Sequence, residues 1–412
     1  MALRSRRSGM ERTMDGMVQH LTSGPNAQAK AALRVRLIAD DLTGALDTAA
    51  QLTAATGPIP VHWRGLPRSN VAGSIAIDSG TREVGRDVAR ATVAALAAGL
   101  GWTSDTILYA KLDSLLRGHA GAEIGAWMSA VAPTHCIVAP AFPYQGRVTR
   151  GGVQLARTAE GWRPVASDLR ADLEREGLAV HLCRPGDAVP AGVSLWDAET
   201  DADLAAIAAV GRALDGPVLW CGSGGLAGAL AQQAGCPAGS QDDATLPGPV
   251  LGLFGTNHPV TAAQLAACSE HTLALPNGGE ASASALSRRL MERGVALAGL
   301  ALPDGLSCAD AANRIEREFA TLVRRLDPPG TLLVAGGETL RGLCAALEAE
   351  RLDLDGHVWP GVPRSVLRGG RFDGVRVVSK SGAFGDPALL RRLVSLNESQ
   401  GAAPHHHQGE EA

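Results

Sequence analysis

Residues 35–50 read VRLIADDLTGALDTAA and join an apolar strand, two carboxylates and the start of a helix. The apolar residues Val35, Leu37 and Ile38 predict a short buried strand that runs directly into Asp40 and Asp41. A strand, an acidic tip and a helix start in quick succession are typical of the ligand-binding edge of an α/β sheet. This stretch therefore predicts an α/β fold with a site at this strand end.

The same stretch carries more polar groups than a helix cap requires. Asp41 and Thr43 are both suited to cap the new helix, because their side-chain oxygens can accept from its first N–H groups. With Asp40 and Asp47, the stretch has four polar groups at one strand tip. This surplus favours a binding site over a capped loop.

Composition limits the classes of protein to which the chain can belong. The 412 residues, 45% hydrophobic and 19% charged, predict two or three globular domains. A formal net charge of −4 gives no sign of nucleic acid or of an anionic membrane as a partner. The seven cysteines are scattered without a C-x-x-C pair, which favours a reduced cytoplasm. No apolar run is long enough for a membrane span.

Apolar strand-like runs alternate with Ala/Leu-rich helical runs along most of the chain. This alternation predicts parallel sheets with helices on both faces, and ligands at the carboxyl ends of the strands. We expect two Rossmann-like α/β domains with an active-site cleft between them. The expected segments are a disordered leader at 1–32, a first domain at 33–231, a polar linker at 232–249, a second domain at 250–398 and a disordered tail at 399–412.

Three further polar stretches follow predicted strands of the first domain. They are SIAIDSGTR at 74–82, KLDSLLRG at 111–118 and APAFPYQGRVTR at 139–150. Together with residues 39–47 they place acids, cations and hydroxyls at four strand ends, a mixture that suits an anionic polyol. Each stretch alone is explained as well by a salt-bridged loop. Their number favours a site for a small hydroxylated acid.

The second domain has glycine-containing loops after its predicted strands. They lie at 253–261 (LFGTNHPVT), 334–342 (VAGGETLRG) and 379–386 (SKSGAFGD). Glycines let backbone N–H groups approach phosphate, and a following helix N-terminus adds its dipole. Lysine occurs only at 30, 111 and 380, so two of the three lysines fall in motif-like stretches, KLDSLLRG of the first domain and SKSGAFGD of the second. A compact ammonium suits phosphate, although chance placement is the alternative explanation.

Familiar nucleotide motifs do not account for these loops. The chain has no Walker A sequence and no protein-kinase motif set. CGSGGLAG at 221–228 resembles a loose dinucleotide fingerprint, but its expected acidic partner would fall in the linker. We interpret this stretch as a tight strand-to-helix turn, facing the interdomain cleft.

In their order, these motifs resemble those of the four-carbon acid sugar kinase family. The matching stretches are ADDxTGA at 39–45, KxDSxxRG at 111–118, APAFPxxGRxT at 139–149, GSxGLA at 222–227, GG[DE]T at 336–339 and KSGxFG at 380–385. The resemblance covers about residues 33 to 395. Departures are a shortened segment at 151–168, Leu115 where threonine is frequent, and Gly255-Thr256 in place of Gly-Ser.

The resemblance implies an N-terminal sugar-acid domain, a C-terminal nucleotide domain and ATP-dependent phosphorylation of the terminal hydroxyl of threonate, erythronate or 3-oxo-tetronate. Expected catalytic carboxylates are Asp40, Asp41 and Asp113, with the base left open among them. Expected substrate-binding residues are Thr43, Asp47, Arg82, Lys111, Ser114 and Arg117. Expected ATP-binding residues are Thr256, His258, Gly336, Gly337, Glu338, Thr339, Lys380, Gly382 and Gly385. Mg²⁺ is expected to bridge the ATP phosphates, without an assigned protein ligand, and the domains are expected to close around the reactants.

Two other classes remain as alternatives. The first is a sugar-acid oxidoreductase that binds NAD(P) at the 222–228 turn, and the second is a sugar-acid sensor without ATP. The expected partners are the sugar acid and ATP, with a homodimer as an option and neither nucleic acid nor membrane. A cytoplasmic location is expected.

Overall fold

The computed structural model describes residues 33–68, 71–235, 245–255, 258–303 and 305–398. The expected leader, the expected tail, Thr256 and residues 236–244 of the expected linker lie outside the described residues. The first described half ends with a helix that reaches Gln233, two residues into the predicted linker. Within the described residues, no helix is long and apolar enough to cross a membrane.

The first half alternates strands and helices from its start. Its strands are β1 (Arg34–Ala39), β2 (Ile59–His62), β3 (Ile75–Asp78), β4 (Thr106–Lys111), β5 (His135–Ala139), β6 (Arg147–Arg150), β7 (Val153–Thr158), β8 (Gly161–Pro164), β9 (Val180–Cys183), β10 (Gly192–Trp196) and β11 (Val218–Gly222). Its helices are α1 (Leu42–Thr56), α2 (Arg86–Gly99), α3 (Ala120–Val131), α4 (Leu169–Arg175), α5 (Asp201–Arg212), α6 (Gly224–Gln233) and a 3₁₀ turn, η1 (Pro143–Gln145).

The second half continues the alternation and then adds a hairpin. Its strands are β12 (Val250–Phe254), β13 (Thr272–Leu275), β14 (Val295–Leu300), β15 (Thr331–Ala335), β16 (Arg351–Trp359), β17 (Val362–Arg368) and β18 (Arg376–Lys380). Its helices are α7 (Pro259–Ala266), α8 (Glu280–Arg293), α9 (Cys308–Val323), α10 (Gly337–Ala346) and α11 (Leu389–Glu398).

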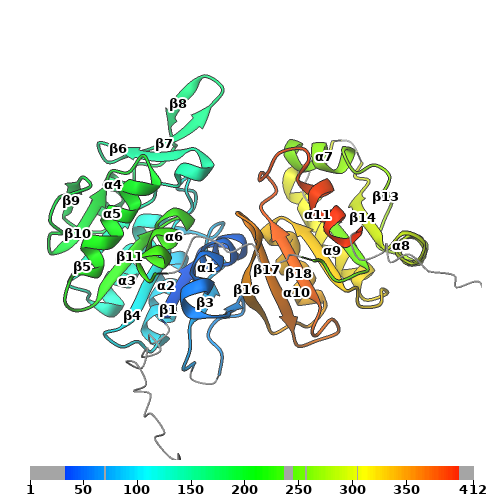
Figure 1. Cartoon of the computed structure of the whole chain (residues 1–412), viewed down its shortest axis with the longest axis horizontal. Helices are drawn as coiled ribbons and strands as arrows, with labels where there is room; N and C mark the ends of the chain where they lie inside the picture. Colours follow the sequence, from blue (N-terminus) through cyan, green and yellow to red (C-terminus); the bar gives the residue numbers. More distant parts are fainter. Residues whose placement is uncertain (1–32, 69–70, 236–244, 256–257, 304, 399–412) are drawn as a thin grey trace, which may run out of the picture. The chain divides into compact units, whose positions relative to one another are not determined.

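The main sheet contains strands from both halves in one hydrogen-bonded series (Figure 1). Its order is β13-β14-β12-β15-β18-β17-β16-β2-β3-β1-β4-β11-β5-β10-β9. The strands of each half pair in parallel, whereas β17 pairs antiparallel with both β16 and β18. The β16 strand also pairs antiparallel with β2, with Leu352 opposite Val61 and Leu354 opposite Ile59. The predicted two α/β domains are confirmed, and the antiparallel connection between them is an addition that the sequence did not indicate.

Burial on both faces explains why the central strands are apolar runs. In β1, Val35, Leu37 and Ala39 contribute to one hydrophobic cluster, while Ile38 contributes to another with residues of β3 and β4. The alternation follows from the two-residue period of a strand. Helix α1 packs its buried leucines and alanines against the first of these clusters. Parallel sheets covered on both faces require this pattern.

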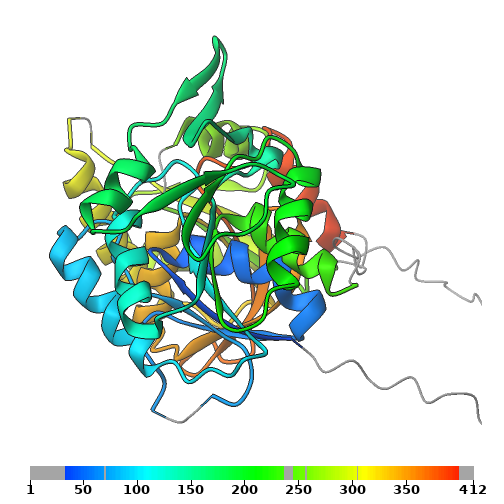
Figure 2. The same ribbon diagram turned by 90° about the vertical axis from the view of Figure 1, so that its left-hand side faces the viewer.

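A small antiparallel sheet, β6-β7-β8, projects from the first half (Figures 1 and 2). Strands β7 and β8 fall in the shortened segment at 151–168, which therefore forms a hairpin. The hairpin is anchored at its base, where Thr149 donates from Oγ1 to Gln154 Oε1 at 2.7 Å and both residues are buried.

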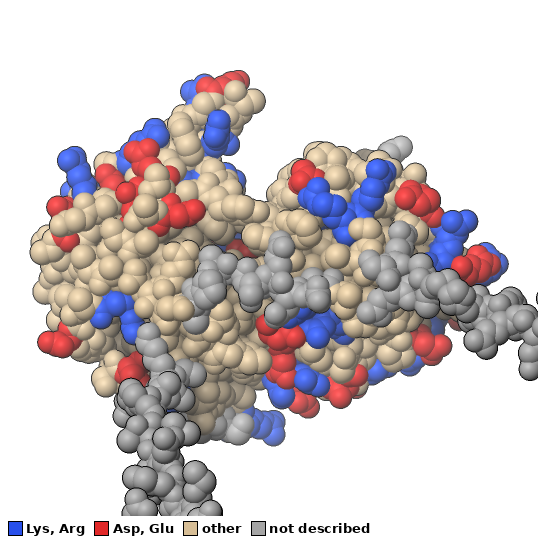
Figure 3. Space-filling view, in the orientation of Figure 1, with Lys and Arg blue, Asp and Glu red and all other residues tan. Residues whose placement is uncertain are grey.

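Acidic and basic side chains are interspersed over the face shown in Figure 3.

Candidate active site

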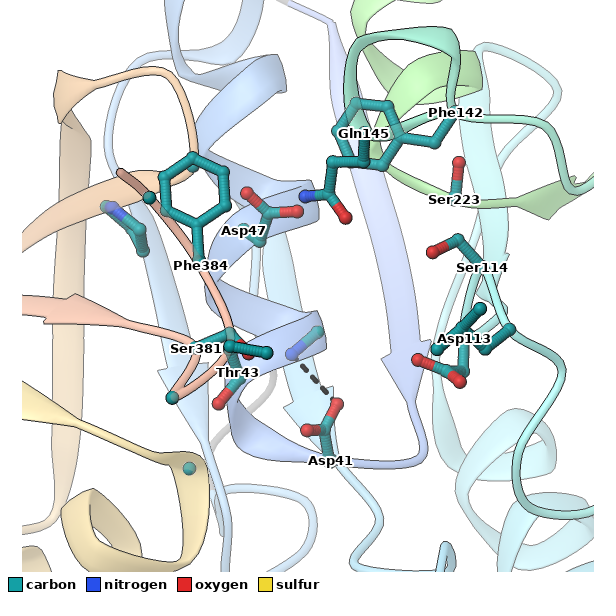
Figure 4. Close-up of a pocket in the computed structure, with 18 of the residues that line it drawn as sticks. Asp41, Thr43, Asp47, Asp113, Ser114, Phe142, Gln145, Ser223, Ser381 and Phe384 are labelled. Carbon is teal, nitrogen blue, oxygen red and sulfur yellow. Dashed lines mark hydrogen bonds between the residues drawn. The ribbon is translucent and has the colours of Figure 1, made fainter. Parts of the chain in front are cut away.

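A pocket of about 680 Å³ is lined by residues from both halves of the chain (Figure 4). From the first half they include Asp41, Thr43, Asp47, Arg82, Lys111, Asp113, Ser114 and Arg117. From the second half they include Gly337, Glu338, Ser381, Gly382, Phe384 and Gly385. The six predicted substrate-binding residues are thus brought together, and they face part of the predicted nucleotide loops.

Arg82 is the centre of an acidic cluster. Its Nε and Nη2 donate to the two carboxylate oxygens of Asp40, each at 2.7 Å. The Nη2 atom also donates to Asp41 Oδ1 at 2.8 Å, and Nη1 lies 2.7 Å from Asp41 Oδ2. Asp113 Oδ1 lies 3.7 Å from Nη2. One guanidinium therefore holds the carboxylates that follow β1 and β4, which are two neighbouring strands.

Asp41 also begins helix α1. It has an extended backbone, and its Oδ1 accepts from the N–H of Gly44 at 2.9 Å, the dashed line in Figure 4. A Cβ atom on Gly44 would lie 2.6 Å from Asp41 Oδ1 and 2.9 Å from Lys111 Nζ. Glycine is therefore required for this close approach of cap, helix and lysine. Of the two predicted caps, Asp41 is confirmed.

Asp113 is fixed by a second arginine. Arg117 donates from Nε to Asp113 Oδ2 at 2.7 Å and from Nη2 to Oδ1 at 2.8 Å. Burial alone would raise the pKa of Asp113, but the hydrogen bonds and charge of Arg117, with the charges of Arg82 and Lys111, bring this pKa well below its ordinary value. Asp113 is therefore a stable anion and a weak base.

Asp40 lies behind the pocket wall and is only 3% exposed. Burial raises its pKa, and the hydrogen bonds and charge of Arg82 oppose this rise. Glu123 of α3 is also buried and accepts from Thr81 Oγ1 at 2.5 Å. Burial and the nearby charge of Asp40 raise the pKa of Glu123 to about 8, so this carboxyl is mainly neutral at pH 7.

Lys111 differs from the two arginines in having no fixed partner. It ends strand β4 and lines the pocket. Within the described part of the chain, no side-chain hydrogen bond or ion pair engages its ammonium group. The lysine is therefore the cation of the pocket that is best placed to meet an incoming anion.

Asp47 lies on α1 one helical turn after Thr43, and its carboxyl group points into the space between Phe384 and Gln145 in Figure 4. Its Oδ1 is buried and has no hydrogen-bond partner among the described residues. Burial raises the pKa of Asp47 to about 6; the Lys111 charge opposes that rise, and the Asp41 charge adds to it. This is the carboxyl group of the pocket whose protonation changes close to neutral pH.

The second half presents the N-terminus of α10 to the pocket. Gly336 precedes this helix with φ of 100°, a conformation that favours glycine, and no side chain caps the helix. The first N–H groups of an uncapped helix remain free to bind an anion. Gly337 and Glu338 line the pocket, whereas Thr339 packs against Gly255 outside it.

Lys380 has a position different from the predicted one. It is 1% exposed and does not line the pocket. Its Nζ donates to Thr261 Oγ1 at 3.1 Å and to the carbonyls of Ser381 and Phe384 at 3.0 and 3.2 Å. With three donors used inside the protein, Lys380 supports the loop at 381–386 and has no donor left for phosphate in this conformation. Burial lowers its pKa to about 8.

The remaining predicted nucleotide residues have mixed positions. Gly382 and Gly385 line the pocket, and Gly385 has φ of 92°. His258 caps helix α7, where its Nδ1 accepts from the N–H of Val260 at 3.2 Å. Thr256 lies outside the described residues. Among the residues described, no group of three or more His, Cys, Asp or Glu side chains is arranged to hold a metal ion.

Several pocket residues were absent from the predicted site. They are Phe142, Tyr144, Gln145 and Arg147 from the stretch after β5, Ser223 from the turn after β11, and Trp359, Pro363, Phe384 and Arg392 from the second half. The first five and Phe384 belong to motifs that the sequence did single out, but a motif does not say which side chains face the ligand. The tip of the β16–β17 hairpin had no preceding signal, because neither strand was predicted.

Models of two protein families match the chain, one for each half. The sugar-binding N-terminal domain matches residues 35–174, and the nucleotide-binding C-terminal domain matches residues 251–390. Similar curated proteins include a D-threonate kinase of Cupriavidus necator, 34% identical over 86% of this chain and 95% of its own length. A D-erythronate kinase of Heliobacterium modesticaldum is 26% identical over 85% and 94% of the two chains.

Further similarity is found among 3-oxo-tetronate kinases and solved structures. The 3-oxo-tetronate kinase of Pseudomonas fluorescens is 28% identical over 84% of this chain and 93% of its own. A solved structure of a Haemophilus influenzae protein superposes with a TM-score of 0.64 at 19% identity, over 88% of this chain and 99% of that one. The latter supports the fold alone.

Proposed function

Because the chain belongs to the four-carbon acid sugar kinase family, it is a sugar acid kinase, and we propose that it transfers the γ-phosphoryl group of ATP to the terminal hydroxyl of a four-carbon acid. D-Threonate is the first substrate to test, since the two relatives at 34% and 30% identity are both named D-threonate kinases. D-Erythronate and 3-oxo-tetronate follow from the names of other relatives.

The observation that carries this proposal is a single pocket with an acid-binding side and a phosphate-binding side. On the first side, Arg82 and Arg117 are occupied by carboxylates, whereas Lys111 is available to the carboxylate of a sugar acid. Thr43 and Ser114 line the same side and offer hydroxyls to the substrate hydroxyls. Arg82 fixes the geometry of this wall, which favours precise positioning of the acceptor.

The second side fits the phosphates of a nucleotide. The uncapped start of α10 at Gly337 and the glycines of the loop at 381–386 leave backbone N–H groups accessible, whereas the N–H of Gly336 donates to the Lys380 carbonyl at 2.9 Å. We propose that these groups hold the ATP phosphates and that Lys380 contributes indirectly, by fixing the loop. When bound, ATP supplies the phosphoryl group. Mg²⁺ is proposed to accompany ATP, held largely by phosphate oxygens.

The function is tested by measuring ADP release with D-threonate, L-threonate, D-erythronate and 3-oxo-tetronate, each with and without Mg²⁺. We expect turnover with at least one acid, dependence on Mg²⁺, and a phosphate monoester at the terminal carbon by ³¹P and ¹³C NMR. Lys111→Met should abolish this turnover, while Arg163→Met, on the exposed hairpin, should retain it. Absence of acid-dependent ADP release with every acid would refute the proposal.

A further inference from the structure

We propose that Asp47, and not Asp40, Asp41 or Asp113, is the general base that accepts the proton of the attacking hydroxyl. This inference rests on the kinase function proposed above and assigns a role at the same pocket. The other three aspartates were the expected candidates, and the geometry points away from each of them.

The three expected candidates are already committed to arginines. Both oxygens of Asp40 accept from Arg82, and Asp40 does not line the pocket. Asp41 accepts from Arg82 and from the N–H of Gly44, so it serves as a helix cap as well as an ion-pair partner. A carboxylate whose lone pairs are occupied by guanidinium groups is poorly prepared to take up a proton.

Asp113 is excluded by the same argument in a stronger form. Both of its oxygens accept from Arg117 at 2.7 and 2.8 Å, and its pKa is held well below the ordinary value by that pairing. A base this weak leaves little driving force for proton transfer from an alcohol. Asp113 therefore suits a structural or electrostatic role.

Asp47 has the opposite arrangement. No arginine engages it within the described residues, and its buried Oδ1 lacks a hydrogen-bond partner. A buried polar atom without a partner calls for an explanation, and a catalytic or ligand-binding role is one that fits an atom on a pocket wall. The second oxygen is closely confined, since a Cβ on Gly224 would lie 3.2 Å from Oδ2 and 3.1 Å from the Phe142 ring. The carboxylate is therefore held in a narrow space on the pocket wall.

The surroundings of Asp47 also give it suitable basicity. The charged or titratable groups that act on it are Lys111 and Tyr109 of β4 and Asp41 of its own helix. Burial raises the pKa of Tyr109 well above its ordinary value, so the phenol stays neutral. Burial likewise raises the pKa of Asp47 to about 6 against the opposing charge of Lys111. A base with a pKa close to the working pH is ionised and still a useful proton acceptor.

The position of Asp47 places it between the two reactants. In Figure 4 the carboxyl group lies between Gln145, on the acid-binding side, and Phe384, on the loop proposed to hold phosphate. During transfer, the substrate O–H bond breaks and its proton moves to an Asp47 oxygen. The substrate oxygen forms a bond to the γ-phosphorus of ATP as the bond to the β-phosphate oxygen breaks, and ADP leaves with that electron pair.

The decisive experiment compares Asp47→Asn with wild type in steady-state kinetics. We expect kcat to fall by about 100-fold or more, with KM for the sugar acid within about threefold, because general bases contribute on the order of 10²–10⁴ in rate. Asp47→Glu, which keeps a carboxylate, should recover part of this loss. Asp87→Asn makes the same change at a carboxylate whose side chain is 92% exposed and should match wild type.

Two readouts separate a base from a binding residue. Wild-type kcat should decrease below pH 6, where Asp47 is protonated, and this limb should be absent in Asp47→Asn. Calorimetric titration of the sugar acid without nucleotide should give similar affinities for both proteins, which also shows that the variant is folded. A variant that loses affinity but keeps kcat would overturn the proposal in favour of substrate binding.

The outcomes also separate this inference from the proposed function. If wild type fails to phosphorylate any sugar acid, the function itself is wrong. If wild type is active and Asp47→Asn retains more than a third of kcat, the function stands and the assignment of the base is refuted.

Discussion

Replacing Arg82 with methionine should destabilise the first half of the chain strongly, because it leaves Asp40 as a buried unpaired carboxylate. Both oxygens of Asp40 lose their donors at 2.7 Å, and the residue is 3% exposed. Asp41 keeps the N–H of Gly44 and Asp113 keeps Arg117, so Asp40 dominates the loss. Breaking a buried ion pair from one side typically costs about 3–5 kcal/mol, and we expect this range for Arg82→Met.

The assay is equilibrium urea unfolding followed by the fluorescence of the buried tryptophans Trp127 and Trp196, which report on the first half. The loss should be smaller at pH 5 than at pH 8, because the unpaired Asp40 can then be protonated. Adding Asp40→Asn to Arg82→Met should recover much of the stability by removing the buried charge. Arg163→Met, whose ion-pair partner Glu160 is exposed, should leave the midpoint unchanged.

The reasoning would be refuted by a loss below about 1 kcal/mol, the range of an exposed ion pair. It would also fail if the double variant were no more stable than Arg82→Met alone. In either case, the acidic cluster would be held by something other than the Arg82 guanidinium.

Three further predictions concern Glu123, Lys380 and Gly337. Glu123→Gln should be more stable than wild type at pH 8.5, and its free energy of unfolding should depend less on pH. The pKa of Glu123 is about 8 in the folded state against the ordinary 4.5, so the stability that wild type has below pH 4.5 is lost as pH rises through 8. Urea unfolding from pH 4.5 to 9 checks this. Lys380→Met should weaken ATP binding several-fold and speed amide hydrogen exchange at residues 381–386, since three hydrogen bonds that hold this loop are lost; unchanged exchange would contradict the indirect role. Gly337→Ala should impair both halves of the site, because the new Cβ would lie 2.5 Å from Thr43 Oγ1; its cost, about 1–3 kcal/mol in urea unfolding, should shrink when Thr43→Ala is added.

The parts of the fold that were predictable are those in which local pattern and tertiary environment agree. Strands buried on both faces appear as apolar runs, and β1, β12 and β15 are of this kind. The acidic tip at Asp40 and Asp41 was found for the same reason. It follows a strand of this kind, where parallel sheets bind ligands.

The hairpin of β16 and β17 was missed because its sequence lacks that apolar continuity. Arg351, Asp353 and Asp355 alternate with apolar residues, and charged side chains argue against a central strand. In the structure these charges neutralise one another, with Arg351 and Arg368 both on Asp353 at 2.7 Å. A search for apolar runs does not detect such neutralisation, because it does not consider the pairing of β16 with β17.

Individual roles in the site were less predictable than its location. Lys380 was expected on phosphate because lysine is rare and the loop is glycine-rich, yet its ammonium is buried among Thr261 and two carbonyls. Asp47 was expected only to bind substrate, since nothing in the local sequence distinguishes it from other helical aspartates. Its distinct environment comes from Lys111, Phe142 and Gly224, which are remote in the chain.

The antiparallel pairing of β2 with β16 has a mechanical consequence for catalysis. Interstrand pairing continues from one half of the molecule to the other, so a hinge rotation of the two halves would break the hydrogen bonds between β2 and β16. A twisted sheet can instead absorb torsion spread over many strands. Uptake of reactants and release of products should then depend on the elastic compliance of the sheet near β16, and stiffening that strand should slow the cycle without touching any reacting group.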